Sequence, residues 1–177
     1  MAKHYVLAIV LLTLFLSGCF ESTTPTSTST STSIPKAGFT TYTDASGFYQ
    51  IDFPTSWKKY VPPKNTEHLA SFSDPNAYLS VGIKIYVNQY STITLDDYTQ
   101  DQIAYVTGYL QSKIIEQAKT TLSGYPAYRI TYSSTAVPYS ISIWTVNGNK
   151  VYRIDYQGPE TDLDMANYVI SSFKVLN

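Results

Sequence analysis

The amino-acid sequence predicts an α+β domain from residue 38 to residue 177, in which a central antiparallel sheet is flanked by helices. Three observations lead to this class. Apolar and polar residues alternate along many short stretches, as they do in half-buried strands. Turn residues that favour hairpins separate several of these stretches. Only two longer stretches show helical spacing, and antiparallel strands with a few inserted helices form layered α+β domains.

The first part of this domain is predicted to contain two pairs of strands. Residues 39–42 and 48–53 lie on either side of residues 44–47, a turn that begins with Asp and ends with Gly. Residues 68–73 and 77–87 lie on either side of an Asp-Pro-Asn turn. Every second residue of the last strand falls on one face, which is formed by Val81, Ile83, Ile85 and Val87.

A helix is predicted in the middle of the domain. Thr94 and Asp97 resemble a capping box in which Asp takes the place of Glu, so the helix should begin after Thr94. A strand at residues 115–122 is expected to follow it. The apolar residues that predict the helix have helical spacing and are Ile103, Val106, Leu110 and Ile114.

The last part of the domain is predicted to contain three further strands and a helix. The strands are centred on residues 128–132, 139–143 and 151–155, and Asn147-Gly148-Asn149 between the last two is a strong hairpin signal. The final helix should open at Pro159 and Glu160. Its buried stripe is expected to consist of Leu163, Ala166, Ile170 and Phe173.

The N-terminal segment has the features of a secretory signal. Lys3 precedes an apolar run at residues 5–16, which is too short to span a hydrocarbon core of about 30 Å. The run ends in Leu-Ser-Gly-Cys, which resembles the lipobox of prokaryotic lipoproteins. The resemblance implies that residues 1–18 are removed as a signal peptide and that Cys19 carries the lipid. The alternative is an ordinary signal peptide with an incidental cysteine.

Residues 19–37 are predicted to form a disordered tether that starts at the lipidated cysteine. Eleven of the twelve residues at 22–33 are Ser or Thr, so this segment has little to bury. About 16 flexible residues reach roughly 22 Å. Two acyl chains on Cys19 would anchor the chain stably at the cell membrane, facing outside the cytoplasm. The Ser/Thr stalk is similar to those of surface lipoproteins from archaea and some Gram-positive bacteria.

The order of elements resembles the PsbP-like domain, a family that also includes the Ran-binding Mog proteins. The resemblance rests on the opening from Tyr42 to Trp57, the helix after Leu95, the turn at residues 124–128 and the closing Ile-Ser-Ser-Phe at residues 170–173. It implies a central antiparallel sheet flanked by helices in an α/β/α sandwich. Photosynthetic members act at photosystem II, but nothing in this chain points to photosynthesis.

Charge and cysteine content exclude several classes of protein. The formal net charge is −1 and only two of the twelve basic residues are Arg, so the chain lacks the basic surface of a nucleic-acid-binding protein. A single cysteine excludes a disulfide framework and a four-ligand Cys/His zinc site. We therefore expect no nucleic-acid partner, no cofactor and no metal site.

Groups that could carry out catalysis are scarce. His68 would be the one histidine left after signal removal, and no Gly-x-Ser-x-Gly motif accompanies it, so we expect an edge or turn residue. Asp97 and Asp101 lie in one predicted first helical turn, and the acidic residues at 160–164 lie in another, where negative charge stabilises the helix. These considerations predict a protein that is not an enzyme.

The seventeen tyrosines are the unusual feature of the composition. Tyrosine suits both a strand and a binding face, because it offers a large contact area at low entropic cost. Tyr105 and Tyr109 lie four residues apart on the predicted middle helix and are the candidate binding residues. Trp57 and Trp144 are expected to be core anchors.

The sequence thus predicts a membrane-anchored lipoprotein whose domain binds an envelope partner or acts as an accessory or assembly module. Two alternatives remain open. A solute-binding module would need an apolar pocket of at least about 300 Å³ with a few polar groups. A hydrolase that uses carboxylates alone would need two inward-facing Asp or Glu side chains about 5–10 Å apart.

Overall fold

A computed structural model describes residues 35–61, 68–77, 81–135 and 139–176. The predicted signal segment, Cys19 and most of the tether lie outside these residues. Within them, no helix is long and apolar enough to cross a membrane. The strands are β1 (Phe39–Thr43), β2 (Tyr49–Pro54), β3 (Lys58–Tyr60), β4 (His68–Ser73), β5 (Gly82–Gln89), β6 (Lys113–Leu122), β7 (Tyr125–Ser133), β8 (Ser140–Asn147), β9 (Lys150–Gln157) and β10 (Lys174–Val175). The helical segments are α1 (Leu95–Ala104), the π-helical turn η1 (Tyr105–Tyr109), the 3-10 turn η2 (Glu160–Asp162) and α2 (Leu163–Ser172).

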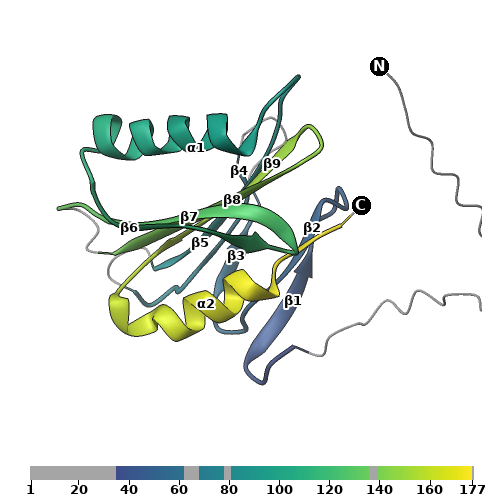
Figure 1. The fold of residues 1–177 in the computed structure, drawn as a ribbon. Coiled ribbons are helices and arrows are strands. Elements are labelled where there is room, and N and C mark those ends of the chain that lie inside the picture. The colour runs from purple at the N-terminus through teal and green to yellow at the C-terminus, as the bar shows by residue number, and fades with distance from the viewer. Residues whose placement is uncertain (1–34, 62–67, 78–80, 136–138, 177) are drawn as a thin grey trace, which may run out of the picture. The chain divides into compact units, whose positions relative to one another are not determined.

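The described strands form two antiparallel sheets. The larger has seven strands in the order β3-β4-β5-β9-β8-β7-β6, and the smaller has three in the order β1-β2-β10. In Figure 1, α1 lies over one face of the large sheet, whereas α2 and the small sheet lie on the other. We refer to these as the α1 face and the α2 face. The arrangement confirms the α+β class with an antiparallel sheet between helices.

The main hydrophobic core fills the α2 face. It joins the large sheet to α2 and to the small sheet through aromatic contacts: Phe53 packs on Phe72 with ring centroids 4.4 Å apart, and Tyr49 stacks on Phe173 at 5.4 Å. Trp57 belongs to this core, as the sequence predicted. Side chains with no exposed surface here include Tyr49, Ile51, Ala70, Phe72, Ile83, Ile85, Ile141, Ile154, Ala166 and Val169.

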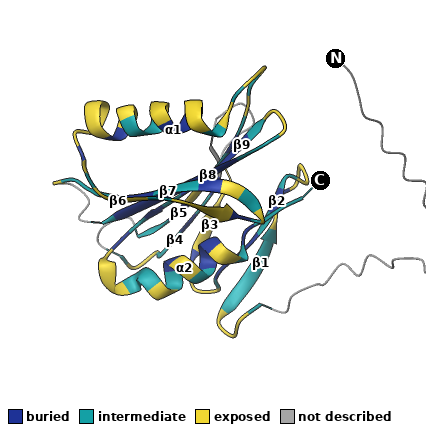
Figure 2. Cartoon of the chain, viewed as in Figure 1, coloured by how far each residue is buried: buried dark blue, intermediate teal, exposed yellow. Residues whose placement is uncertain are grey.

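The core on the α1 face is smaller and includes a buried polar contact. Tyr98 and Val106 pack against the sheet residues Ile130, Trp144 and Val151. The buried Trp144 indole donates a hydrogen bond to the Thr99 hydroxyl at 2.9 Å, which satisfies its N–H. Figure 2 shows that the buried residues of α1 and α2 lie on the sides that face the sheet.

Turn and cap chemistry explains why several elements begin where the sequence predicted. The Asp44 carboxylate accepts a hydrogen bond from the Ser46 N–H at 2.9 Å, and Gly47 provides the positive φ of +72° that closes the β1–β2 hairpin. Thr94 caps α1 by accepting from the Asp97 N–H at 3.1 Å. The hairpin at Asn147-Gly148-Asn149 joins β8 to β9 as expected.

The predicted extent of the middle helix is wrong at its C-terminal end. Gln111 adopts a left-handed conformation with φ of +49°, which turns the chain out of the helix. Leu110 is exposed, and Ile114 pairs with Tyr132 inside β6, which begins two residues earlier than expected. The helical spacing of Leu110 and Ile114 was therefore fortuitous.

Smaller differences concern short or irregular elements. The short strands β3 and β10 were not predicted, and β5 begins at Gly82 rather than at residue 77. The final helix opens with η2, so α2 itself starts at Leu163. Asp162 holds the N-cap position of α2 without a capping hydrogen bond from its side chain. Phe173 follows the last helical residue but is buried, as the predicted stripe requires.

Candidate functional site

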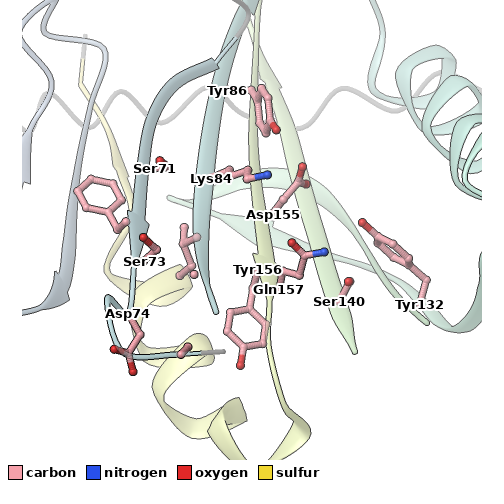
Figure 3. A pocket seen from close by; sticks show the side chains of 14 residues that line it. Ser71, Ser73, Asp74, Lys84, Tyr86, Tyr132, Ser140, Asp155, Tyr156 and Gln157 are labelled. Carbon is pink, nitrogen blue, oxygen red and sulfur yellow. The ribbon is translucent and has the colours of Figure 1, made fainter. Parts of the chain in front are cut away.

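The α1 face is only partly covered by its helix. Helix α1 packs over Ile130, Trp144 and Val151, and the opposite ends of the same strands border an open cavity of about 370 Å³. We call this the polar-face cavity (Figure 3). The side chains labelled there are Ser71, Ser73, Asp74, Lys84, Tyr86, Tyr132, Ser140, Asp155, Tyr156 and Gln157.

A partly buried ion pair adjoins the polar-face cavity, and its Asp155 lines the cavity. Arg153 and Asp155 lie two residues apart on β9, so both point to the α1 face, and Arg153 Nε lies 3.2 Å from Asp155 Oδ2. The contact is ionic rather than a well-aligned hydrogen bond. Ser142 donates to the other Asp155 oxygen at 2.7 Å. The carboxylate is therefore held from two strands.

The Arg153 guanidinium also joins α1 to the sheet. It donates to Gln102 Oε1 at 2.8 Å and, over 3.4 Å, to the Tyr98 hydroxyl, and both acceptors belong to α1. Its other contact is a cation–π interaction in which the guanidinium carbon lies 4.0 Å from the centre of the Tyr86 ring. Arg153 thus fixes the position of α1 beside the polar-face cavity.

Burial and the ion pair set the protonation states around the polar-face cavity. Burial alone would lower the pKa of Arg153, but Asp155 and the hydroxyls of Tyr98 and Tyr86 outweigh it, so that the pKa is raised. Burial, and secondarily Asp155, raises the pKa of Tyr86 and of Tyr132. These phenols are therefore neutral at physiological pH and can both donate and accept hydrogen bonds.

The polar-face cavity contains two carboxylates that the sequence analysis did not single out. Asp155 could have been noticed, because Arg153 and Asp155 place opposite charges at i and i+2 on a strand whose other face is apolar. Asp74 accepts a hydrogen bond from the Asn76 N–H at 2.8 Å and shapes its own turn. Lys84 lies opposite Asp155 in the β5–β9 register. Among the described residues, no three potential ligands gather into a metal site.

A second feature, which we call the tyrosine tip, consists of Tyr105, Tyr109, Leu110 and Ile115. Their exposed fractions are 45%, 78%, 36% and 55%. The structure describes six exposed large hydrophobic residues, and four of them lie in this short segment. The Tyr105 and Tyr109 rings stack with centroids 5.2 Å apart and planes inclined by 15°. Both tyrosines are solvent-facing, and their role in binding stays a prediction.

The backbone of η1 presents these rings. The Leu110 N–H donates to the Tyr105 carbonyl at 3.0 Å, five residues back, which is the hydrogen bond of a π-helical turn. Such turns are frequent at functional sites. Tyr105 also contributes, as the smallest of several causes, to the raised pKa of Tyr86, which lines the polar-face cavity.

The other residues considered for catalysis lie away from these features. His68 begins β4, where its backbone pairs with Tyr86, and its side chain is outside the described part. Asp97 lies in the first turn of α1, and its carboxylate accepts from the Thr94 hydroxyl at 2.6 Å. Asp101 is exposed and lies beyond the first turn of α1, so its predicted place in that turn is wrong. The structure does not bring these residues together.

Comparison with solved structures identifies the architecture. Cyanobacterial PsbP (CyanoP) from Synechocystis sp. PCC 6803 matches with a TM-score of 0.62 and 18% identity, over 80% of this chain and 95% of that chain. The fold is PsbP-like. LpqN, described as involved in cell envelope biogenesis of Mycobacterium tuberculosis, matches with a TM-score of 0.51 and 13% identity, over 78% and 91% of the two chains.

A protein from Bacteroides thetaiotaomicron matches with a TM-score of 0.51 and 11% identity, over 79% of this chain and 49% of that chain. No family model and no curated protein matches the sequence. At these identities the likeness concerns the fold, so function has to be argued from this chain's own surfaces.

Proposed function

We propose that this protein is a lipid-anchored, extracytoplasmic accessory module that binds a protein partner of the cell envelope and does not catalyse a reaction. The observation that carries the proposal is the tyrosine tip, where exposed aromatic and aliphatic side chains gather in one short segment. A PsbP-like fold, shared with an envelope-associated protein, supports an accessory role.

The tyrosine tip has the chemistry of a protein-binding surface. Tyrosine is enriched at interface hot spots, and stacked rings lose little conformational freedom when they are covered. Residues 105–110 contain no charged side chain. Binding through them should therefore depend only weakly on salt, because few charges would be screened.

The proposal of a non-catalytic role rests on how the carboxylates of the polar-face cavity are used. Asp155 is engaged by Arg153 and Ser142, and Asp74 holds its own turn. A carboxylate-dependent hydrolase would need one of them as an acid or a nucleophile. We expect Asp155→Asn and Asp74→Asn to change the stability of the protein. Neither substitution should abolish a hydrolase activity that the wild-type protein shows.

Anchoring is proposed to depend on Cys19. The Cys19→Ala variant should yield an uncleaved or a released protein instead of a lipid-modified one. Partition of the chain into a detergent phase, followed by mass spectrometry of its N-terminus, measures this. If the Cys19→Ala variant, after removal of its signal, still partitions into the detergent phase as the wild-type protein does, the lipoprotein assignment is contradicted.

The partner-binding role is tested by capture from detergent-solubilised membranes with the immobilised full-length chain. The double variant Tyr105→Ser, Tyr109→Ser should lose the captured partner at both low and high salt. Tyr60→Ser is the matched control, since Tyr60 is an exposed tyrosine of β3 with 59% exposure. Neither His68→Ala nor the double variant Asp97→Asn, Asp101→Asn should abolish capture.

Two results would overturn this role. One is equal loss of capture in the Tyr60→Ser control, and the other is binding that collapses at high salt, which would indicate a charge-driven contact. Loss of capture by the His68→Ala variant, with the fold retained, would instead favour an enzyme.

A solute-binding module is a second candidate, favoured by the polar-face cavity itself. Its volume of about 370 Å³ exceeds the size requirement, but its hydroxyl, amide and charged lining suits a small polar solute rather than an apolar one. A solute that binds there should lose affinity on Lys84→Met while partner capture is unchanged.

A further inference from the structure

The chain contains two arginines, and their surroundings differ sharply. Arg153 engages a carboxylate, an amide oxygen and two tyrosines on the α1 face. Arg129 on β7 forms no ion pair within the described part of the chain, and its buried Nε has no hydrogen-bond partner there. The Arg129 side chain as a whole is only half-buried, so solvent reaches part of a cation that has no counter-charge among the described residues, which suggests that an anion is supplied from outside.

Arg129 lies on the opposite side of the sheet from the polar-face cavity. It is the β7 residue next after Ala127 on the α2 face, and it pairs with Ala118 and with Ile143. Beyond the cover of α2, a groove of about 480 Å³ separates that helix from the β6–β7 hairpin. This groove, which we call the Arg129 groove, is lined by Thr120, Thr121, Leu122, Ser123, Gly124, Arg129, Ile143, Asn167, Ile170 and Ser171.

The lining of the Arg129 groove combines three kinds of group. Among the described residues, Arg129 is the one charged side chain that lines it, and no carboxylate does. Thr120 and Asn167 supply a hydroxyl and an amide donor that are accessible to solvent, whereas the Ser171 hydroxyl donates to the Tyr168 carbonyl at 2.8 Å. The apolar side is formed by Leu122, Ile143 and Ile170.

We propose that the Arg129 groove binds a carboxylate carried on a small apolar body. A guanidinium presents two parallel N–H groups that match the two oxygens of a carboxylate. One cation balances one carboxylate, whereas a phosphate dianion would keep excess charge in this groove. The apolar side accounts for the rest of the ligand. The site shares no residue with the tyrosine tip, so it is tested separately from the proposed partner binding.

Titration of the full-length, isotope-labelled chain in a non-ionic detergent tests the site, with butyrate, butyramide and inorganic phosphate as probes at equal ionic strength. Butyrate should produce saturable shifts in the backbone amides of residues 120–124 and 167–171. Butyramide has the same apolar body without the charge, and it should bind at least about tenfold more weakly, as should phosphate.

Variants distinguish the guanidinium from a general charge effect. Arg129→Gln should weaken butyrate binding by about tenfold or more, and Arg129→Lys should restore only part of it, since an ammonium lacks the fork. The matched control is Lys119→Gln, which removes one positive charge from an exposed β6 position opposite Tyr128. If Arg129→Gln does not fold, the pair Thr120→Ala, Asn167→Ala provides the test and should weaken binding severalfold.

The inference is overturned if butyramide or phosphate binds as tightly as butyrate. It is equally overturned if Lys119→Gln weakens butyrate binding as much as Arg129→Gln does, or if neither the Arg129 variants nor the Thr120, Asn167 pair weakens it.

Discussion

The two faces of the large sheet differ in what they bury. On the α2 face, α2 and the small sheet close over a continuous apolar core, and α2 buries Ala166, Val169 and Ile170. On the α1 face, α1 buries Tyr98 and Thr99, contacts a charged network and leaves a polar cavity and exposed tyrosines beside it. The comparison indicates that stability is concentrated on one face, which leaves the other free to carry a binding surface.

The largest effect is expected from truncating the α2-face core. Phe72 has no exposed surface and contacts the rings of Phe53 and Tyr42. Phe72→Ala should lower the free energy of unfolding by about 3–5 kcal/mol, because it leaves a cavity. Ser71→Ala, next to it on the α1 face, should change it by less than about 0.5 kcal/mol. Urea unfolding measures both, and similar losses would break the contrast between the faces.

Breaking the ion pair on the α1 face should cost somewhat less. Asp155→Ala leaves the Arg153 guanidinium partly buried without its carboxylate, and we expect a loss of about 2–4 kcal/mol. The double variant Arg153→Met, Asp155→Leu should recover much of this loss, because it removes the uncompensated charge as well. A double variant that is less stable than Asp155→Ala would show that the pair itself stabilises the fold.

Alkaline pH should weaken the α1 face through Tyr98. Burial raises the pKa of Tyr98 to about 12 from an ordinary value of 10.0. Its contribution to stability is complete below pH 10 and is lost as the pH rises from 10 to 12, because the unfolded state ionises first. The expected loss is about 2–3 kcal/mol. Tyr98→Phe cannot ionise, so its unfolding free energy should fall less steeply across this range, and an unchanged slope would contradict the assignment.

The smallest effect on stability is expected at the tyrosine tip. Tyr105 and Tyr109 are exposed and make their ring contact with each other. The double variant Tyr105→Ser, Tyr109→Ser should change the free energy of unfolding by less than about 0.5 kcal/mol. A loss above about 1 kcal/mol in urea unfolding would mean that the rings support α1, and their exposure would then be a weaker argument for binding.

Local sequence chemistry predicted most of the fold. Some features depend only on neighbours in the chain, so they can be predicted without a structure. They are the hairpins at Gly47 and Gly148, the Thr94 cap, and the alternation along β5 and β9. The end of the helical segment depends on the left-handed backbone at Gln111, and glutamine does not favour this conformation. β10 is only two residues long and depends on pairing with distant β2.

The candidate sites were less accessible to sequence reasoning. Tyr105 and Tyr109 could be chosen because their spacing places them together on a helical turn. The polar-face cavity and the Arg129 groove depend on which parts of each face the helices leave uncovered, which only tertiary packing decides. Asp155 at i+2 marks Arg153 as the arginine with a carboxylate on its own strand face, but nothing in the sequence indicates that Arg129 lines a groove.

Hydrogen exchange along the full-length chain tests the division between the faces most directly. Amides of α2 and of the central strand β9 should exchange only through global unfolding. Amides of α1 and η1 should exchange through a local opening whose free energy is at least about 1 kcal/mol lower. Equal opening free energies for α1 and α2, or a more protected α1, would contradict the conclusion that the α2 face holds the fold together while the α1 face opens locally.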